Sequence, residues 1–98
     1  MANYKISNTA KEDLIRIYTY GVIRFGEKQA EKYFNAFFES FEKIAKNPFA
    51  YEAVDHIKEG YRRCISGVDT IYFRFNDDSI EIITIIGKQD MENLKFDL

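Results

Sequence analysis

The sequence has one cysteine, one proline, one histidine and no tryptophan among its 98 residues. A single cysteine cannot form an intramolecular disulfide, and we interpret Cys64, which falls in a predicted strand, as a small buried residue. The histidine, His56, is interpreted as an anchor of a loop. No apolar run is long enough for a signal peptide or a membrane span, so the expected location is the cytoplasm. We expect neither a metal nor a cofactor.

A strong excess of basic residues is also missing, because the formal net charge is −2 and the isoelectric point is near 5.4. Proteins that bind nucleic acid by neutralising phosphates are usually basic, so this balance argues against a general nucleic-acid-binding protein. Aromatic residues, in contrast, are abundant, with nine Phe and seven Tyr. At this density we expect most of them in the interior, although an exposed aromatic groove is also a means of binding a partner helix.

Three short apolar segments follow one another in the second half of the chain, at residues 61–66, 70–75 and 80–86. They are rich in Ile, Tyr and Phe and are separated by Gly, Asn, Asp and Ser, which is typical of β-strands joined by tight turns. The pattern therefore predicts an antiparallel three-stranded meander. The third segment is apolar on both faces, which predicts a central strand covered on both sides.

Side chains on a strand alternate between its two faces, so the same pattern also predicts orientations. Arg62 and Arg63 are neighbours on one strand and are predicted to lie on opposite faces. The middle strand is predicted to turn three residues to the core and two to the other face, respectively Ile71, Phe73 and Phe75, and Tyr72 and Arg74.

The first half of the chain is predicted to contain a strand at residues 3–7 and two helices. Thr9 and Glu12 have the spacing of a capping box, and Ser7 is an alternative N-cap. Gly26 is expected to end the first helix, and Pro48 to bar the second from continuing. The second helix has one apolar stripe, which is expected to lie on the sheet and consists of Ala30, Phe34, Phe37, Phe41, Ile44 and Ala45.

The expected fold is therefore one α+β domain over residues 1–98. It has an N-terminal strand and an antiparallel helical hairpin packed on a sheet, and a C-terminal three-stranded antiparallel meander completes that sheet. Residues 49–59 are expected to form an irregular connection.

Several short motifs occur along nearly the whole chain in a defined order. They are Ser7, Ala10, Asp13-Leu14 and Ile17; Tyr20 and Phe25-Gly26; Gln29-Ala30 and Tyr33; Ile44-Ala45 and Asn47-Pro48; Glu59-Gly60-Tyr61-Arg62-Arg63; Ser66-Gly67; Ile71-Tyr72-Phe73; and residues 82–87 with Asp90. In this order and spacing, and with this succession of elements, the chain resembles the ParE toxins of the RelE/ParE superfamily, which belong to bacterial type II toxin–antitoxin operons.

This resemblance implies a non-catalytic toxin that binds DNA gyrase, with GyrA as the expected subunit, and traps the gyrase–DNA cleavage complex. It also implies a ParD-type antitoxin whose C-terminal segment folds on binding and lies across the toxin. The candidate contacts to antitoxin or target are three helix aromatics and four strand residues, any of which could instead be an ordinary core or surface residue: Tyr18, Tyr33, Phe37, Arg62, Arg63, Tyr72 and Arg74.

A RelE-type, ribosome-dependent mRNA endoribonuclease is the alternative within the superfamily. Cleavage through a 2′-hydroxyl requires cations at the phosphate and a group that transfers protons. Arg63, Arg74 and Lys88 would supply the cations, and Asp90 the proton-transfer group. No Tyr or His follows Tyr72, and an exposed aspartate, with a pKa of about 4, is poorly matched to neutral pH. We therefore favour the gyrase toxin.

Overall fold

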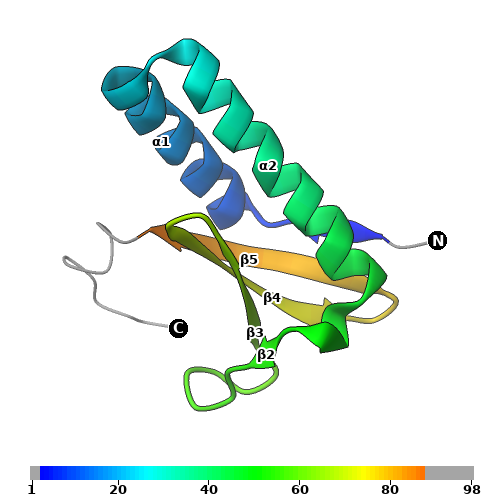
Figure 1. Ribbon diagram of the computed structural model, residues 1–98. Coiled ribbons are helices and arrows are strands. Elements are labelled where there is room, and N and C mark those ends of the chain that lie inside the picture. The colour runs from blue at the N-terminus through cyan, green and yellow to red at the C-terminus, as the bar shows by residue number, and fades with distance from the viewer. Residues whose placement is uncertain (1–2, 88–98) are drawn as a thin grey trace.

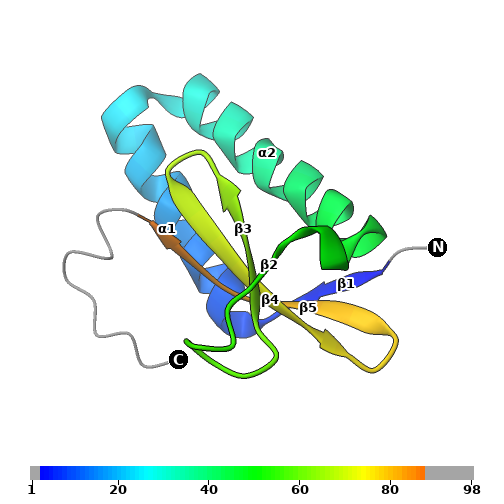
Figure 2. The same cartoon turned by 60° about the horizontal axis from the view of Figure 1, so that its bottom comes forward.

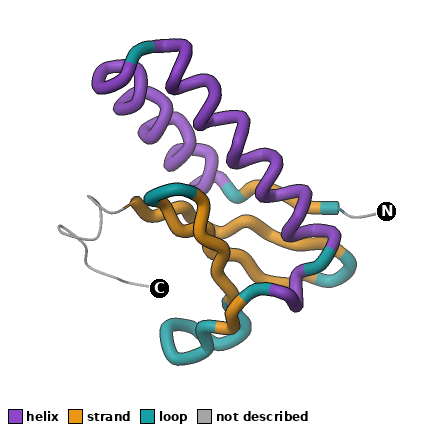
Figure 3. The backbone as a smooth tube through the Cα atoms, viewed as in Figure 1, coloured by secondary structure: helices purple, strands orange, loops and turns teal. Residues whose placement is uncertain are grey.

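The computed structural model describes residues 3–87 and places them in two layers. Helices α1 (Asn8–Phe25) and α2 (Glu27–Lys46) form an antiparallel hairpin that lies on one face of a five-stranded sheet (Figures 1 and 3). The strands are β1 (Tyr4–Ile6), β2 (Glu52–Ala53), β3 (Arg62–Ser66), β4 (Asp69–Asn76) and β5 (Ser79–Gly87). The expected α+β architecture is confirmed. No helix in the described range is both long enough and apolar enough to cross a bilayer.

The sheet has the spatial order β1-β5-β4-β3-β2. Strands β3, β4 and β5 form the predicted antiparallel meander, whereas β1 pairs with β5 in parallel, with Tyr4 opposite Ile80 and Ile6 opposite Ile82. A parallel neighbour requires a crossover, and here the chain between β1 and β5 comprises the helical hairpin followed by β2, β3 and β4.

Helix α1 begins at Ser7, whose hydroxyl accepts a hydrogen bond from the Ala10 N–H at 3.0 Å. Of the two predicted N-caps Ser7 is correct, and the capping box at Thr9 and Glu12 is wrong. The reason is that Ser7 has an extended backbone (φ −66°, ψ 163°), whereas Thr9 already lies within the helix. The hydroxyl of Ser7 also donates to the carbonyl oxygen of Ile83 at 2.7 Å, so the cap is fixed to β5.

The apolar stripe of α2 lies on the sheet, as predicted, and contributes three buried residues to the main core. Phe37, Phe41 and Ile44 have no exposed surface and pack against Ile71, Phe73 and other strand residues. Phe34 differs, because it is only partly buried and its ring lies edge-on to that of Tyr18, with 5.4 Å between centroids. Part of the stripe therefore joins the two helices to each other.

The connection after α2 contains more structure than predicted. Residues 49–59 were expected to be irregular, but they contribute to a 3-10 turn, η1 (Pro48–Ala50), and to the short edge strand β2. Glu52 of β2 pairs with Arg63 of β3 in the ladder and through a 2.9 Å ion pair. A strand of two residues has too few positions to produce an alternating pattern, so the sequence alone could not identify it.

A second, smaller core lies on the sheet face away from the helices. Figure 2 shows the connection between β2 and β3 on that side, and Val54 and Tyr61 at its two ends pack with Tyr72 and Ile86. The register of β4 and β5 shifts at Tyr72, so that Ile83 is an extra residue in β5. This bulge turns Ile83 to the second core, so β5 is covered on both faces, as predicted.

Candidate functional site

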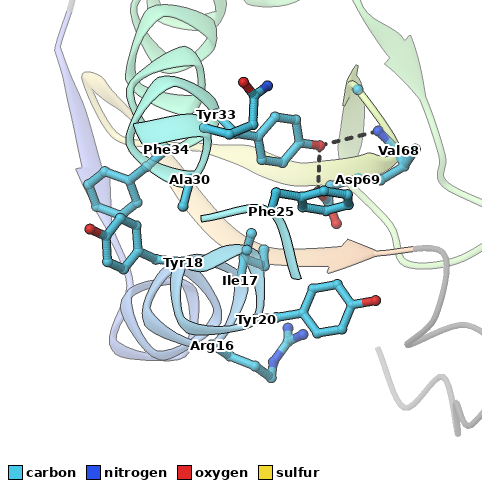
Figure 4. Close-up of a pocket in the computed structure, with 13 residues that line it drawn as sticks. Arg16, Ile17, Tyr18, Tyr20, Phe25, Ala30, Tyr33, Phe34, Val68 and Asp69 are labelled. Carbon is cyan, nitrogen blue, oxygen red and sulfur yellow. Dashed lines mark hydrogen bonds between the residues drawn. The ribbon is translucent and has the colours of Figure 1, made fainter. Parts of the chain in front are cut away.

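A groove opens where the helical hairpin meets the β3–β4 turn (Figure 4). Its volume is about 290 Å³, and α1, α2 and the turn each contribute side chains to it. Most of these side chains are apolar or aromatic. The lining residues are Arg16, Ile17, Tyr18, Tyr20, Gly21, Phe25, Gln29, Ala30, Tyr33, Phe34, Gly67, Val68 and Asp69.

Two small residues bring the helices close together at the base of the groove. A Cβ atom added to Gly21 would lie only 3.3 Å from the Cβ of Ala30, so the helix backbones approach where neither residue has a long side chain. The larger side chains of Tyr18, Phe34 and Phe25 line the groove around this contact (Figure 4). Close packing of α1 and α2 at Gly21 and Ala30 therefore sets the depth to which the groove reaches between the helices.

Tyr33 fixes the β3–β4 turn against α2 and forms one wall of the groove. Its hydroxyl donates to Oδ2 of Asp69 at 2.6 Å, accepts from the N–H of Val68 at 3.2 Å, and lies 2.9 Å from the carbonyl oxygen of Ser66. Gly67 has a φ of 64°, and any side chain there would also collide with the Tyr33 ring. The backbone conformation of this turn therefore requires glycine at position 67.

Tyr33 remains protonated over a wide pH range. Burial raises its pKa above the ordinary value of 10.0, and the hydrogen bond to Asp69 and the negative charge of that carboxylate raise it further. A neutral hydroxyl can donate to the carboxylate, whereas a phenolate would repel it. Since Asp69 is itself only 5% exposed, this donor replaces part of the hydration that Asp69 loses on folding.

The rim of the groove carries apolar side chains that remain in contact with solvent. Phe25 is 65% exposed and Val68 is 68% exposed, and Tyr20 is 42% exposed. These residues come from the end of α1 and from the β3–β4 turn. A partner that covered them would remove apolar surface from water, which is the main source of affinity in apolar grooves.

The structure brings two of the seven candidate contacts, Tyr18 and Tyr33, into this groove. Phe37 has no exposed surface and Tyr72 is 2% exposed, so both are core residues. The sequence had left this role open for them as the alternative to a binding contact. Burial of Tyr72 results from the β2–β3 connection, which closes over the sheet face that alternation assigned to it.

The three strand arginines are each engaged within the molecule. Arg63 pairs with Glu52 at 2.9 Å and Arg74 pairs with Glu81 at 3.0 Å, whereas Arg62 donates to the carbonyl oxygen of Tyr51 at 2.7 Å. Arg62 and Arg74 also line a second, shallower hollow at the other end of β4.

The other residues of the ribonuclease alternative, Lys88 and Asp90, lie outside the described residues. Cys64 is buried in the main core as predicted, and burial raises the pKa of its thiol. Within residues 3–87, no group of three or more His, Cys, Asp or Glu side chains is placed to hold a metal ion.

Sequence reasoning missed most of the groove residues outside α2. Phe25 and Val68 carried a usable signal, because each is a large apolar residue directly beside a glycine at the end of an element, where a side chain is seldom buried. Asp69 gave no such signal, because aspartate is one of the residues that commonly occur in and beside turns. Its proximity to Tyr33 depends on packing between elements that are far apart in the sequence.

Comparison with known proteins places this geometry in a family. The family model described as ParE toxin of the type II toxin–antitoxin system parDE matches residues 4–92. Toxin ParE1 of Caulobacter vibrioides is 35% identical over 86 residues, which is 88% of each chain. Toxin ParE1 of Mycobacterium tuberculosis is 28% identical over 89 residues, which is 90% of this chain and 91% of the relative.

A solved structure shares the fold. A chain of the chromosomal ParDE toxin–antitoxin system from P. aeruginosa superposes with a TM-score of 0.78 at 21% identity, over 89% of this chain and 96% of the other. Since the family model spans most of the sequence and a relative of more than 30% identity covers it at nearly full length, this chain belongs to the ParE toxin family of type II toxin–antitoxin systems.

Proposed function

We propose that this ParE toxin stops growth by poisoning DNA gyrase in the cytoplasm, and that a ParD-type antitoxin neutralises it by filling the groove between the helical hairpin and the β3–β4 turn. Membership of the ParE family supports the toxin assignment. The main support for the antitoxin site is the exposed apolar groove, because a groove of this kind can bind the apolar side chains of a protein segment.

The shape and lining of the groove suit an amphipathic segment that folds as it binds. Such a segment inserts apolar side chains at helical spacing into an apolar groove, and the affinity it gains there must exceed the entropy it loses on folding. The groove offers Ile17 and Ala30 at its base and Phe25 and Val68 at its rim. Arg16, whose side chain is 43% exposed, lines the groove and can contact the polar face of the segment.

The antitoxin part is tested by placing a charge in the groove. We expect Val68→Asp and Phe25→Asp to weaken antitoxin binding at least about tenfold, because a buried unpaired carboxylate is costly and the apolar contact is lost. Ile15→Asp is the matched control, since Ile15 is 66% exposed on α1 and does not line the groove. Calorimetric titration with purified antitoxin gives the affinities. Equal losses in all three variants would refute the assignment of the groove.

The gyrase part is tested with the wild-type chain. Purified toxin should inhibit supercoiling by gyrase and accumulate gyrase–DNA cleavage complexes, and added antitoxin should reverse both effects. Growth arrest with normal supercoiling and with cut transcripts in ribosomes would instead favour the endoribonuclease alternative.

A further inference from the structure

A second exposed surface lies at the end of β4 remote from the groove. Phe49 of η1 and Phe75 of β4 stack with 4.9 Å between ring centroids and 32° between ring planes, yet Phe49 is 68% exposed and Phe75 is 46% exposed. The guanidinium of Arg62 lies 5.0 Å from the centroid of the Phe49 ring. We call Phe49, Phe75 and Arg62 the Phe platform. Two stacked rings at the surface are costly to leave in water, which points to a partner.

Arg62 gives this platform a charge available to a partner. Its hydrogen bond goes to the carbonyl oxygen of Tyr51 at 2.7 Å, and within residues 3–87 no carboxylate forms an ion pair with it. Arg63 and Arg74, in contrast, have Glu52 and Glu81 as acidic partners. A guanidinium has five N–H donors, so Arg62 retains donors for a carboxylate that approaches beside the rings.

The platform borders a stretch of strand edge. Strand β3 pairs with β4 only as far as Arg62 opposite Phe73, so β4 continues beyond its neighbour at residues 74–76. A hollow of about 390 Å³ lies at this place, and Phe49, Phe75 and Arg62 line it. An extended peptide can lie along such an edge while its side chains reach the rings.

The charges around the hollow disfavour nucleic acid as the occupant. Asp55 and Glu59 line it together with Arg62 and Arg74, so the cations are balanced by an equal number of carboxylates. Binding a phosphate backbone requires a net positive groove. A protein segment with one carboxylate beside an apolar side chain fits the arrangement better.

We propose that the Phe platform binds an extended segment of the toxin's target protein, in which an aromatic or aliphatic side chain packs on Phe49 and Phe75 and a neighbouring carboxylate accepts hydrogen bonds from Arg62. The inference rests on the proposed function, since it names the surface through which the target is engaged. The antitoxin is assigned to the groove at the opposite end of β4, about 20 Å away at the rise of a strand. A shallow platform also suits a preformed loop of a folded target better than a segment that must fold on binding.

The test uses the full-length toxin with Phe75→Ser, Phe49→Ser and Arg62→Glu, and with Ile23→Ser as control, because Ile23 is 81% exposed and belongs to neither surface. We expect the three platform variants to lose at least about tenfold in affinity for purified gyrase and to lose growth arrest, with antitoxin affinity unchanged and the circular dichroism spectrum of the folded chain retained. The control should match the wild type in every assay.

Platform variants that still arrest growth fully would overturn the inference, and so would variants that lose antitoxin affinity instead. A wild-type toxin that arrests growth without binding gyrase would contradict the proposed target, and loss of arrest in the platform variants would then still support the platform. A wild-type chain that neither arrests growth nor binds gyrase would contradict both.

Discussion

At the scale of single residues, Tyr33 connects parts of the chain that the sequence keeps apart. It belongs to α2, yet its hydroxyl contacts Ser66, Val68 and Asp69 of the β3–β4 turn. Its ring also lies edge-on to Phe37 with 5.1 Å between centroids, so the same side chain extends the main core. Tyr33 therefore packs in the core through its ring and, through its hydroxyl, donates a hydrogen bond that offsets the cost of burying the Asp69 carboxylate.

Removing the hydroxyl alone separates these roles. We expect Tyr33→Phe to lower the free energy of unfolding by about 1–3 kcal/mol, because Asp69 loses a donor while the ring packing is kept. Tyr20→Phe serves as control, since Tyr20 is 42% exposed and its change should cost less than about 0.5 kcal/mol. Urea denaturation followed by circular dichroism measures both values. A similar cost in the two variants would show that the hydrogen bond to Asp69 contributes nothing.

Tyr33 should also affect the stability of the fold in alkaline solution. Its pKa in the folded chain is raised by burial and by Asp69 above the ordinary 10.0. Above that pH the unfolded chain loses the proton first, so the contribution of Tyr33 is complete below the unfolded pKa and is lost as the pH rises. We expect the stability difference between wild type and Tyr33→Phe to be constant up to about pH 9 and to narrow as the pH rises above about 10. A constant difference would contradict the raised pKa.

At the scale of elements, helix α1 completes the edge of β5 where β1 stops. Strand β1 pairs with β5 only from Ile80 to Ile82. Beyond it, Ser7 binds the carbonyl oxygen of Ile83, and Oδ2 of Asp13 accepts from the Ile85 N–H at 3.0 Å and from the Thr84 hydroxyl at 2.6 Å. Side chains of one helix thus substitute for a longer edge strand and satisfy its polar groups.

This role gives Asp13 a predictable effect on stability. We expect Asp13→Ala to cost about 2–3 kcal/mol, because the Ile85 N–H and the Thr84 hydroxyl lose an acceptor, and Asp13→Asn to cost less because it keeps a carbonyl oxygen. Amide hydrogen exchange should accelerate at Ile85 in Asp13→Ala. The neighbouring Glu12→Ala is the control, since Glu12 is exposed. Unchanged exchange at Ile85 would exclude this account of the β5 edge.

At the scale of the whole molecule, the groove and the Phe platform lie at the two ends of β4, with Val68 beside one end and Phe75 at the other. Residues this far apart without shared neighbours should act independently. One small domain can in this way present separate surfaces to an inhibitor and to a target. Figure 1 shows the same separation, with the α1–α2 connection at one end and η1 beside the β4–β5 turn at the other.

Ligand binding to the groove should stabilise the entire domain. A partner that binds only the folded toxin adds about 2.7 kcal/mol at about a hundredfold excess over its Kd, which corresponds to a rise in Tm of roughly 10 °C or more for a domain of this size. We expect the antitoxin's C-terminal peptide to produce this shift in wild type and in Phe75→Ser, but not in Val68→Asp. Thermal melts at several peptide concentrations measure it. A shift in Val68→Asp as large as in wild type would place the peptide elsewhere.

The sequence by itself determined the two helices, β1 and the meander of β3, β4 and β5. Short apolar segments bounded by turn residues predicted β3, β4 and β5, and the stripe of α2 predicted which face of that helix lies on the sheet, because both signals depend only on neighbours along the chain. The motif order also predicted the ParE family correctly. Among the groove residues, the family resemblance supplied Tyr18 and Tyr33 as candidate contacts.

Only the tertiary structure decided how those elements meet. The burial of Tyr72, the two-residue strand β2 and the contact between Tyr33 and Asp69 each arise from chain segments separated by many residues. A periodic pattern records that a side chain is buried or exposed, but not which distant group covers it. The groove exists because Gly21 and Ala30 let two helices approach and a turn from another part of the chain closes over Tyr33.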